Sequence, residues 1–220
     1  TLNKVTLPIL ANEACWALGN ITYTAIYARI GTSAAASIQI CSTVMNLFMI
    51  VTFGLANAAV VIIGNEIGAN RESEAISASK KISSLSFKIS ILLAIVLAFL
   101  SKPIVSFFNV SVEVKIASEY ILYVYAFILV FKIYNAVMIV GILRGGGDAT
   151  YGSILQGLTL WLIGIPLAAF AAFIIKLPIY FVVMFAAVEE IIKVFFMMKR
   201  FKSFKWIKNM VNDEQNEVLT

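Results

Sequence analysis

The run AAASIQICSTVMNLFMIVTFGLANAAVVIIG, residues 34–64, determines the class of fold to which this chain belongs. It contains no Asp, Glu, Lys or Arg, and about 20 apolar residues are enough for a helix to cross the hydrocarbon core of a membrane. The run is continuous and lacks the alternation of polar and apolar residues that is typical of barrel strands. We therefore predict a transmembrane helix here, long enough to tilt strongly or to extend beyond the bilayer.

Five further stretches have the same character, which predicts six membrane-spanning helices. The predicted spans are residues 5–28, 34–64, 82–100, 120–143, 151–175 and 179–198. Of the 220 residues, 61% are hydrophobic and 13% are charged, and the mean hydropathy is +0.94, which a soluble domain of this size could not bury. We predict an all-α integral membrane protein with residues 65–81 as a long loop and residues 199–220 as a mobile cytoplasmic tail, first basic and then acidic.

The distribution of basic residues predicts the orientation in the membrane. Of the 17 Lys and Arg residues, three lie within the predicted spans and four lie in loops on one side, which leaves ten on the side of both chain ends. Because cytoplasmic loops carry an excess of Lys and Arg, we expect both ends to be cytoplasmic, in the plasma (inner) membrane. The first residue is Thr1, with no secretory signal after it, and we expect the chain to be a piece of a longer protein.

Several classes of function are excluded by composition. The chain has no histidine, so no His-based metal site, haem ligation or Ser-His-Asp triad can form, and we expect no cofactor. Cys15 and Cys41 are isolated in apolar runs, where thiols pack as small hydrophobic groups. The net charge of +5 arises from residues that flank the spans, which favours lipid headgroups over nucleic acid as the partner.

Glu13 is a carboxylate inside the first predicted span, where a charge costs roughly 2.5–3.5 kcal/mol on insertion scales. We expect either a cation site or a proton carrier, although a neighbouring helix near the headgroups could also satisfy the carboxylate. At 100° per residue, the residues on the same face of this helix are Trp16, Asn20, Tyr23, Thr24 and Tyr27. This polar and aromatic face suits an organic cation, although aromatic residues also fill bundle interiors, and lipid-linked or anionic cargo stays open.

Lys132 is a second charge inside a span, and Asn135 follows it by three residues. Since Glu13 is the acid that the sequence places deep in another span, we predict a Glu13–Lys132 pair, with snorkelling of the lysine as the alternative. In the second span, Asn46 shares a face with Gln39 and Asn57, which either bind substrate or join helices by hydrogen bonds. The candidate ion- or substrate-binding residues are Glu13, Asn20, Tyr23, Asn46, Lys132 and Asn135.

Two features of the last spans favour structural roles. The spacing of Glu189, Glu190 and Lys193 predicts local ion pairs at the cytoplasmic headgroup boundary. Pro166 lies in the middle of the fifth span and predicts a kink there.

Two loops carry motifs, GNEIGANRESEA at residues 64–75 and GILRGGGDAT at residues 141–150. The glycine run of the second loop is not a phosphate loop, because no strand precedes it and no G-K-[ST] follows. Glycines there can end one helix, and Asp148 or Thr150 can cap the next.

These loops resemble those of the multidrug and toxic compound extrusion (MATE) transporters. The first is similar to the family's G-x-x-x-G-A segment, and the second to its L-R-G-x-G-D-T turn with Ala149 inserted before Thr150. Leu7-Pro8-Ile9 followed by Glu13 resembles the start of the family's seventh helix. The resemblance implies that the chain is the second lobe of a twelve-helix, pseudo-symmetric transporter whose first six-helix lobe is missing here.

The resemblance also implies a function, which is antiport rather than enzymatic catalysis. Family members export mostly cationic organic molecules in exchange for Na⁺ or H⁺ as two lobes rock about a central cavity. Glu13 matches the family's cation-linked acid. Many members carry a second acid on the tenth helix, but here that neighbourhood holds Lys132 and Ile133, with no acid. The coupling ion therefore stays open, and so do two other classes of function, a non-catalytic membrane scaffold subunit and a membrane-embedded enzyme. The enzyme is the weaker alternative, because Asp148 and Asp213 both lie outside the predicted spans.

Overall fold

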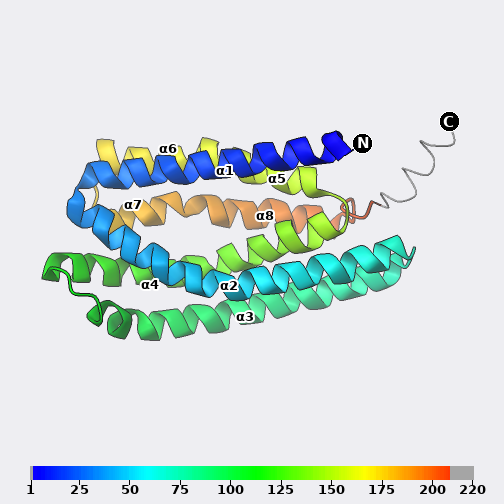
Figure 1. The fold of residues 1–220 in the computed structure, drawn as a ribbon, viewed down its shortest axis with the longest axis horizontal. Coiled ribbons are helices and arrows are strands. Elements are labelled where there is room, and N and C mark those ends of the chain that lie inside the picture. The colour runs from blue at the N-terminus through cyan, green and yellow to red at the C-terminus, as the bar shows by residue number, and fades with distance from the viewer. Residues whose placement is uncertain (1, 209–220) are drawn as a thin grey trace.

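The computed structural model describes residues 2–208, and for residues 2–12 it describes the backbone alone. Long helices run side by side along the molecule (Figure 1). The α-helices are α1 (Leu2–Ile30), α2 (Thr32–Gly68), α3 (Glu72–Ser106), α4 (Val112–Ala136), α5 (Ala149–Thr159), α6 (Ile165–Ala169), α7 (Ile179–Ala186) and α8 (Val188–Lys202). Three π-helical stretches continue them: η1 (Val137–Leu143), η2 (Leu160–Gly164) and η3 (Phe170–Ile174).

The prediction of an all-α membrane protein is confirmed. In the described part of the chain, four segments are long and apolar enough to cross a membrane: α2, α3, α4 with η1, and α5 through η3. The helix α1 occupies the first predicted span, and α7 and α8 occupy the last one and meet at Ala187. Pro166 lies in α6 directly after η2, so the predicted kink falls where the regular i→i+4 hydrogen-bond ladder has already been interrupted.

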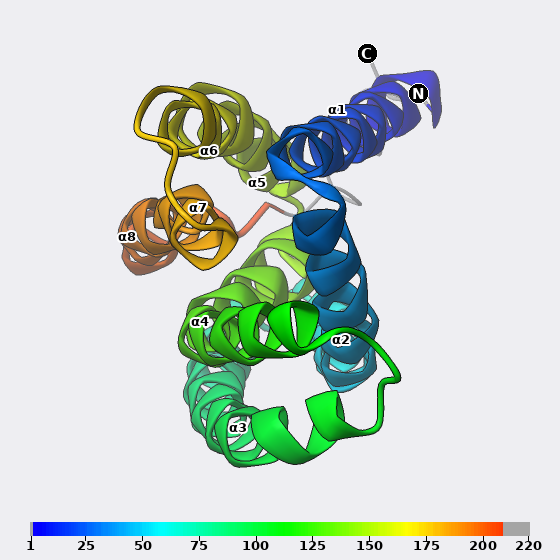
Figure 2. The ribbon, with the colours of Figure 1, turned by 90° about the vertical axis from the view of Figure 1, so that its left-hand side faces the viewer.

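The helices form two groups when the molecule is viewed end-on. Helices α2, α3 and α4 lie together on one side, and α1 with α5 to α8 lies on the other (Figure 2). The rod of α4 and η1 is central, since it packs against α2, α3, α7 and α8. Its core residues Leu122, Leu129, Ile133, Val137 and Ile142 are completely buried. This rod therefore holds the two groups together.

The loop predicted at residues 65–81 is mostly helix, because α3 begins at Glu72. Glu72 and Glu74 occupy the first turn, where negative side chains stabilise the positive end of the helix dipole. The turn before it is fixed by an ion pair of 2.7 Å between Arg71 Nε and Glu66 Oε2. Hydropathy alone missed these first turns of α3, because they extend beyond the apolar part of the helix.

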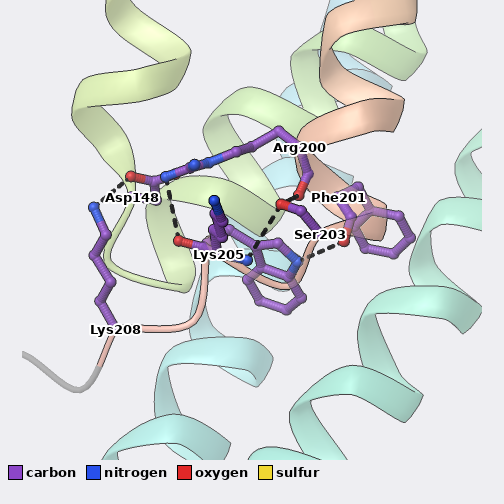
Figure 3. A network of polar contacts seen from close by, with 7 residues as sticks. Asp148, Arg200, Phe201, Ser203, Lys205 and Lys208 are labelled. Atoms are coloured by element: carbon purple, nitrogen blue, oxygen red, sulfur yellow. Dashed lines mark hydrogen bonds and ion pairs between the residues drawn. The ribbon is translucent and has the colours of Figure 1, made fainter.

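The segment after α8 docks against the turn between η1 and α5 (Figure 3). Asp148 is 2% exposed and accepts from Arg200 Nε at 2.7 Å and from Lys208 Nζ at 2.6 Å. It occupies the N-cap position of α5, but its side chain makes no capping hydrogen bond, so that part of the prediction is wrong.

Trp206 completes this docked segment and is fully buried. Its ring lies against Gly146, where a Cβ would meet both the ring and the backbone of Trp206, and the Lys208 amide donates to the Gly146 carbonyl at 2.8 Å. The expectation of a mobile tail is therefore wrong for residues 199–208, while Asp213, Glu214 and Glu217 lie outside the described residues.

Candidate functional site

The polar face predicted on α1 divides into an exposed part and a buried part. Trp16 and Asn20 are exposed, as are Glu13 and Thr24, whereas the rings of Tyr23 and Tyr27 turn into the lobe and stack with their centroids 6.0 Å apart. Residues 13–18 are exposed on every face of the helix, so position along α1 decides exposure there. From Glu13 onward, the first buried residue of α1 is Gly19, against which Leu160 packs, and before it Trp161 Nε1 donates to the Cys15 carbonyl at 3.3 Å.

Glu13 does not pair with Lys132, so the predicted ion pair is wrong. The Glu13 side chain is 57% exposed, and its Oε1 lies 3.9 Å from Nη2 of Arg144. Arg144 directly follows η1, and Lys132 lies twelve residues earlier on the same rod, which is about 18 Å along the axis. A carboxylate beside Arg144 is therefore far from Lys132.

Asn20 and Asn46, like Glu13, lie on the open surface of α1 and α2 rather than in an enclosed site. Asn20 Nδ2 donates to the Trp16 carbonyl of its own helix at 2.8 Å. Asn46 is exposed on α2. Together these residues give the open surface polar groups in an otherwise apolar environment.

A second group of polar residues lies inside the lobe, between α1, α4 and α8. We call it the buried charge cluster, and its members are Tyr23, Asn135, Glu189, Glu190 and Lys193, with the exposed Lys132 at its edge. Asn135 is 2% exposed, and its Nδ2 donates both to Oε2 of Glu190 at 2.7 Å and to the Glu190 carbonyl at 2.8 Å. Nζ of Lys193 lies 3.3 Å from Oε1 of Glu190. One carboxylate thus links α4 to α8.

Glu189 faces the opposite way, toward α1 and η2. Its carboxylate interacts with the Tyr23 hydroxyl above Gly164, although neither the hydroxyl nor Oε2 of Glu189 forms a hydrogen bond of regular geometry. A Cβ at position 164 would lie 2.9 Å from Oε2 of Glu189 and would overlap the Tyr23 hydroxyl. Glycine at this position is therefore what allows the tyrosine and the carboxylate to meet.

Lys132 extends the cluster from α4, since it interacts electrostatically with both Glu189 and Glu190 while remaining exposed. Two carboxylates on α8 are therefore influenced by two ammonium groups, of which Lys193 forms a direct ion pair with Glu190. Oδ1 of Asn135 is also buried without a hydrogen-bond partner. Unpartnered buried oxygens are unusual in proteins, and each calls for an explanation such as a water, an ion or a functional role.

The sequence interpretation of Glu189, Glu190 and Lys193 is partly wrong. The local pair between Glu190 and Lys193 is confirmed, but Glu189 and Lys193 are only 8% and 5% exposed, so they do not lie at a solvated boundary. A signal was present, because the apolar run VFFMM at residues 194–198 continues beyond Lys193. Two adjacent acids followed by more apolar residues need partners inside a bundle.

The two cysteines differ in their surroundings. Cys41 is buried, and its Sγ donates to the Ser118 carbonyl at 3.4 Å, as expected for a packed thiol, while Cys15 is exposed. Among residues 2–208, no group of three or more His, Cys, Asp or Glu side chains is arranged to hold a metal ion.

Similarity to solved structures shows which fold this arrangement belongs to. A MOP superfamily transporter from Pyrococcus furiosus matches with a TM-score of 0.85 at 16% identity, over 94% of this chain and 46% of that one. A mutant of the Vibrio cholerae MATE transporter VcmN matches with a TM-score of 0.81 at 15% identity, over 93% of this chain and 47% of that one. An outward-facing multidrug resistance MATE family transporter of the MOP superfamily matches with a TM-score of 0.78 at 16% identity, over 94% of this chain and 46% of that one.

The chain spans about half the length of these transporters, which corresponds to one of their lobes. No curated protein matches the sequence. The family model for MatE, however, matches residues 8–170, which include α1 to α5, both motif loops and most of the fifth span. This chain belongs to the MatE family.

Proposed function

We propose that the chain is one lobe of a cation-coupled antiporter that exports organic, mainly cationic compounds by alternating access. The observation that carries the proposal is the MatE match over residues 8–170 in a chain that has the fold of half a transporter. In this proposal the coupling ion is Na⁺ or H⁺, and the first lobe completes the transport cavity. Both chain ends are placed on the cytoplasmic side, as the excess of basic residues there predicts.

The open surface of α1 and α2 is the wall of the proposed cavity. Large apolar side chains such as Leu18, Ile21 and Leu47 are more than half exposed there, and polar Asn20 and Asn46 lie among them. Polar side chains inside a membrane normally face a bundle interior or a water-filled cavity rather than lipid. A second lobe facing this surface would enclose both kinds of residue.

Glu13 is the proposed meeting point of substrate and coupling ion. Its separation of 3.9 Å from Arg144 is long for an ion pair, and its side chain is 57% exposed, so a cation can approach it. Trp16, one turn further along α1, is 49% exposed and can stack on an organic cation. Binding of the ion and of the substrate to the same carboxylate would then be mutually exclusive.

Glu189 is a second candidate for the coupling acid. It joins α1 to α8 through Tyr23 without a regular hydrogen bond, so a change in its occupancy by a proton or an ion would alter the contact between these helices. Such a contact is a suitable link between ion loading and the movement of α1.

The test measures ethidium efflux from cells that lack their main efflux pumps and express the full-length protein containing this lobe. Wild type is compared with Glu13→Gln and Glu189→Gln at matched membrane levels, with Na⁺ present or absent. Glu74→Gln is the control, because Glu74 is exposed in the first turn of α3. We expect efflux by wild type and the control, and loss of efflux in at least one of the two variants.

Other outcomes separate the alternatives. Equal efflux in all four proteins would place coupling outside this lobe. The scaffold function would be favoured by two results together. The wild-type protein would export none of a panel of organic cations, and Glu13→Gln and Glu189→Gln would leave its assembly with partners unchanged. Dependence of efflux on Na⁺ or on an imposed pH difference identifies the ion.

A further inference from the structure

A groove of about 460 Å³ lies between α3, α4 and α8, and its lining on α4 and α8 directly neighbours members of the buried charge cluster in sequence. In the end-on view α8 lies at the left and α3 at the bottom of the lobe, whereas α1 and α2 lie to the right, with α2 packed against α3 (Figure 2). If α1 and α2 face a second lobe, this groove therefore faces lipid. Its lining residues are Lys80, Ser83, Ser84, Phe87, Val130, Phe131, Tyr134, Val194, Met198 and Phe201.

The lining is ordered along the groove, with its charge at one end. On α3 it runs from Lys80 to Phe87, a distance of about 10 Å along the axis. On α8 it runs in the opposite chain direction, from Phe201 back to Val194, and the segment after α8 meets α3 where Nζ of Lys80 lies 6.0 Å from the centroid of the Phe204 ring. The cationic end therefore coincides with the basic end of the lobe, and the deeper part is aromatic and aliphatic.

The depth of the groove matches the boundary between headgroups and acyl chains. The helix α3 has 35 residues and is about 52 Å long, so it extends well beyond a hydrocarbon core of about 30 Å. The predicted span of α3 begins at Ile82, but serines and Lys88 keep its first turns polar, so the groove from Lys80 to Phe87 lies at the boundary itself, with Lys80 on the headgroup side. At the other wall, the basic residues Lys199 and Lys202 flank Phe201 at the same end of the lobe.

The charge of the groove is not neutralised by the protein. No acidic side chain lines it, and among the described residues Lys80 forms no ion pair with a carboxylate. Two polar groups of the lining, the hydroxyls of Ser83 and Tyr134, bond to each other at 3.1 Å. A ligand for this groove should thus combine one negative group with a long apolar chain.

We propose that the groove binds an anionic glycerophospholipid of the leaflet on the basic side of the membrane. One acyl chain lies between Phe87, Val130 and Val194, and the headgroup phosphate lies at Lys80. Basic pockets between transmembrane helices on the cytoplasmic side are known to hold anionic headgroups. The proposal rests on the proposed function for one premise, that α1 and α2 face a second lobe and the groove faces lipid, but it requires neither Glu13 nor transport activity.

The experiment measures lipid retention by native mass spectrometry of the full-length protein, purified in mild detergent and titrated with phosphatidylglycerol or phosphatidylcholine. Lys80→Gln removes the charge, and Ser84→Trp fills the groove from an exposed position. Lys81→Gln is the matched control, because Lys81 has the same depth but does not line the groove.

We expect wild type to retain phosphatidylglycerol in preference to phosphatidylcholine, with about fivefold weaker retention in Lys80→Gln. Ser84→Trp should lose retention of both lipids, and Lys81→Gln should match wild type. Equal retention of the two lipids by wild type would overturn the proposal, and so would equal losses in Lys80→Gln and Lys81→Gln, which indicate only a general surface attraction. Unchanged retention in Ser84→Trp would show that the acyl chain lies elsewhere.

Discussion

Replacement of Gly164 by alanine tests the contact at the centre of the buried charge cluster. The added Cβ would lie 2.9 Å from the Glu189 carboxylate and would overlap the Tyr23 hydroxyl, both of which are side-chain groups held by packing. Forcing an extra methyl group into a packed interior typically costs about 1–3 kcal/mol. We expect Gly164→Ala to be destabilised by this amount relative to a glycine replaced in open space.

Gly157 provides that reference within the same transmembrane segment. A Cβ at position 157 has no heavy atom within 4 Å. Both substitutions gain the same helix propensity, about 1 kcal/mol for Gly→Ala, so this gain cancels when the two variants are compared. The difference between their free energies of unfolding isolates the crowding above Gly164.

Tyr23→Phe identifies the group that is crowded. It removes the hydroxyl and leaves the Glu189 contact, so Gly164→Ala should cost less in the Tyr23→Phe background, by about 1 kcal/mol. The assay follows tryptophan fluorescence of the full-length protein during unfolding in detergent micelles by a denaturing detergent. If the free energies of unfolding of Gly164→Ala and Gly157→Ala agree within about 0.5 kcal/mol, the reasoning about this contact is refuted.

Four other substitutions can be measured in the same unfolding assay. Asp148→Asn should lower the free energy of unfolding by about 2–3 kcal/mol, because Asp148 is 2% exposed and Arg200 would lose its charged partner. Lys208→Gln should lower it by at most about 1 kcal/mol, since Lys208 is 45% exposed. A cost for Lys208→Gln as large as that for Asp148→Asn would contradict this ranking. Trp206→Ala should lower the free energy of unfolding by about 3–5 kcal/mol and should make the segment after α8 accessible to proteases. Unchanged protease resistance would show that other contacts hold this segment. Asn135→Leu should cost about 1–3 kcal/mol, because it leaves Glu190 without its donor at 2.7 Å, and a stabilised variant would argue against that bond.

Most of the fold could be predicted from the sequence because the bilayer imposes a strong constraint on length and polarity. The run at residues 34–64 could be little else than a membrane helix, and the two motif loops indicated the family. The helix boundaries were less predictable, since α3 begins at Glu72, ten residues before its apolar part. Hydropathy detects the part of a helix in the hydrocarbon core, but not the turns outside it.

The buried charge cluster was only partly predictable. Tyr23, Lys132 and Asn135 were selected because polar residues are costly in a span, but Lys132 was assigned to Glu13. Its actual neighbours, Glu189 and Glu190, are brought to it by packing of α8 against α4, which no local pattern encodes. The exposure of Trp16, eleven residues before the buried Tyr27 on the same helix, has the same origin, because coverage of α1 depends on where other helices end.

The most direct test of the central claim is gradient-driven transport by the full-length protein in proteoliposomes. We expect an organic cation such as ethidium to move against an imposed Na⁺ or H⁺ gradient, with wild-type rates in Glu74→Gln and loss of gradient dependence in Glu13→Gln or Glu189→Gln. Absence of gradient-dependent movement of any organic cation by the folded wild-type protein would contradict the assignment of this lobe to a cation-coupled antiporter.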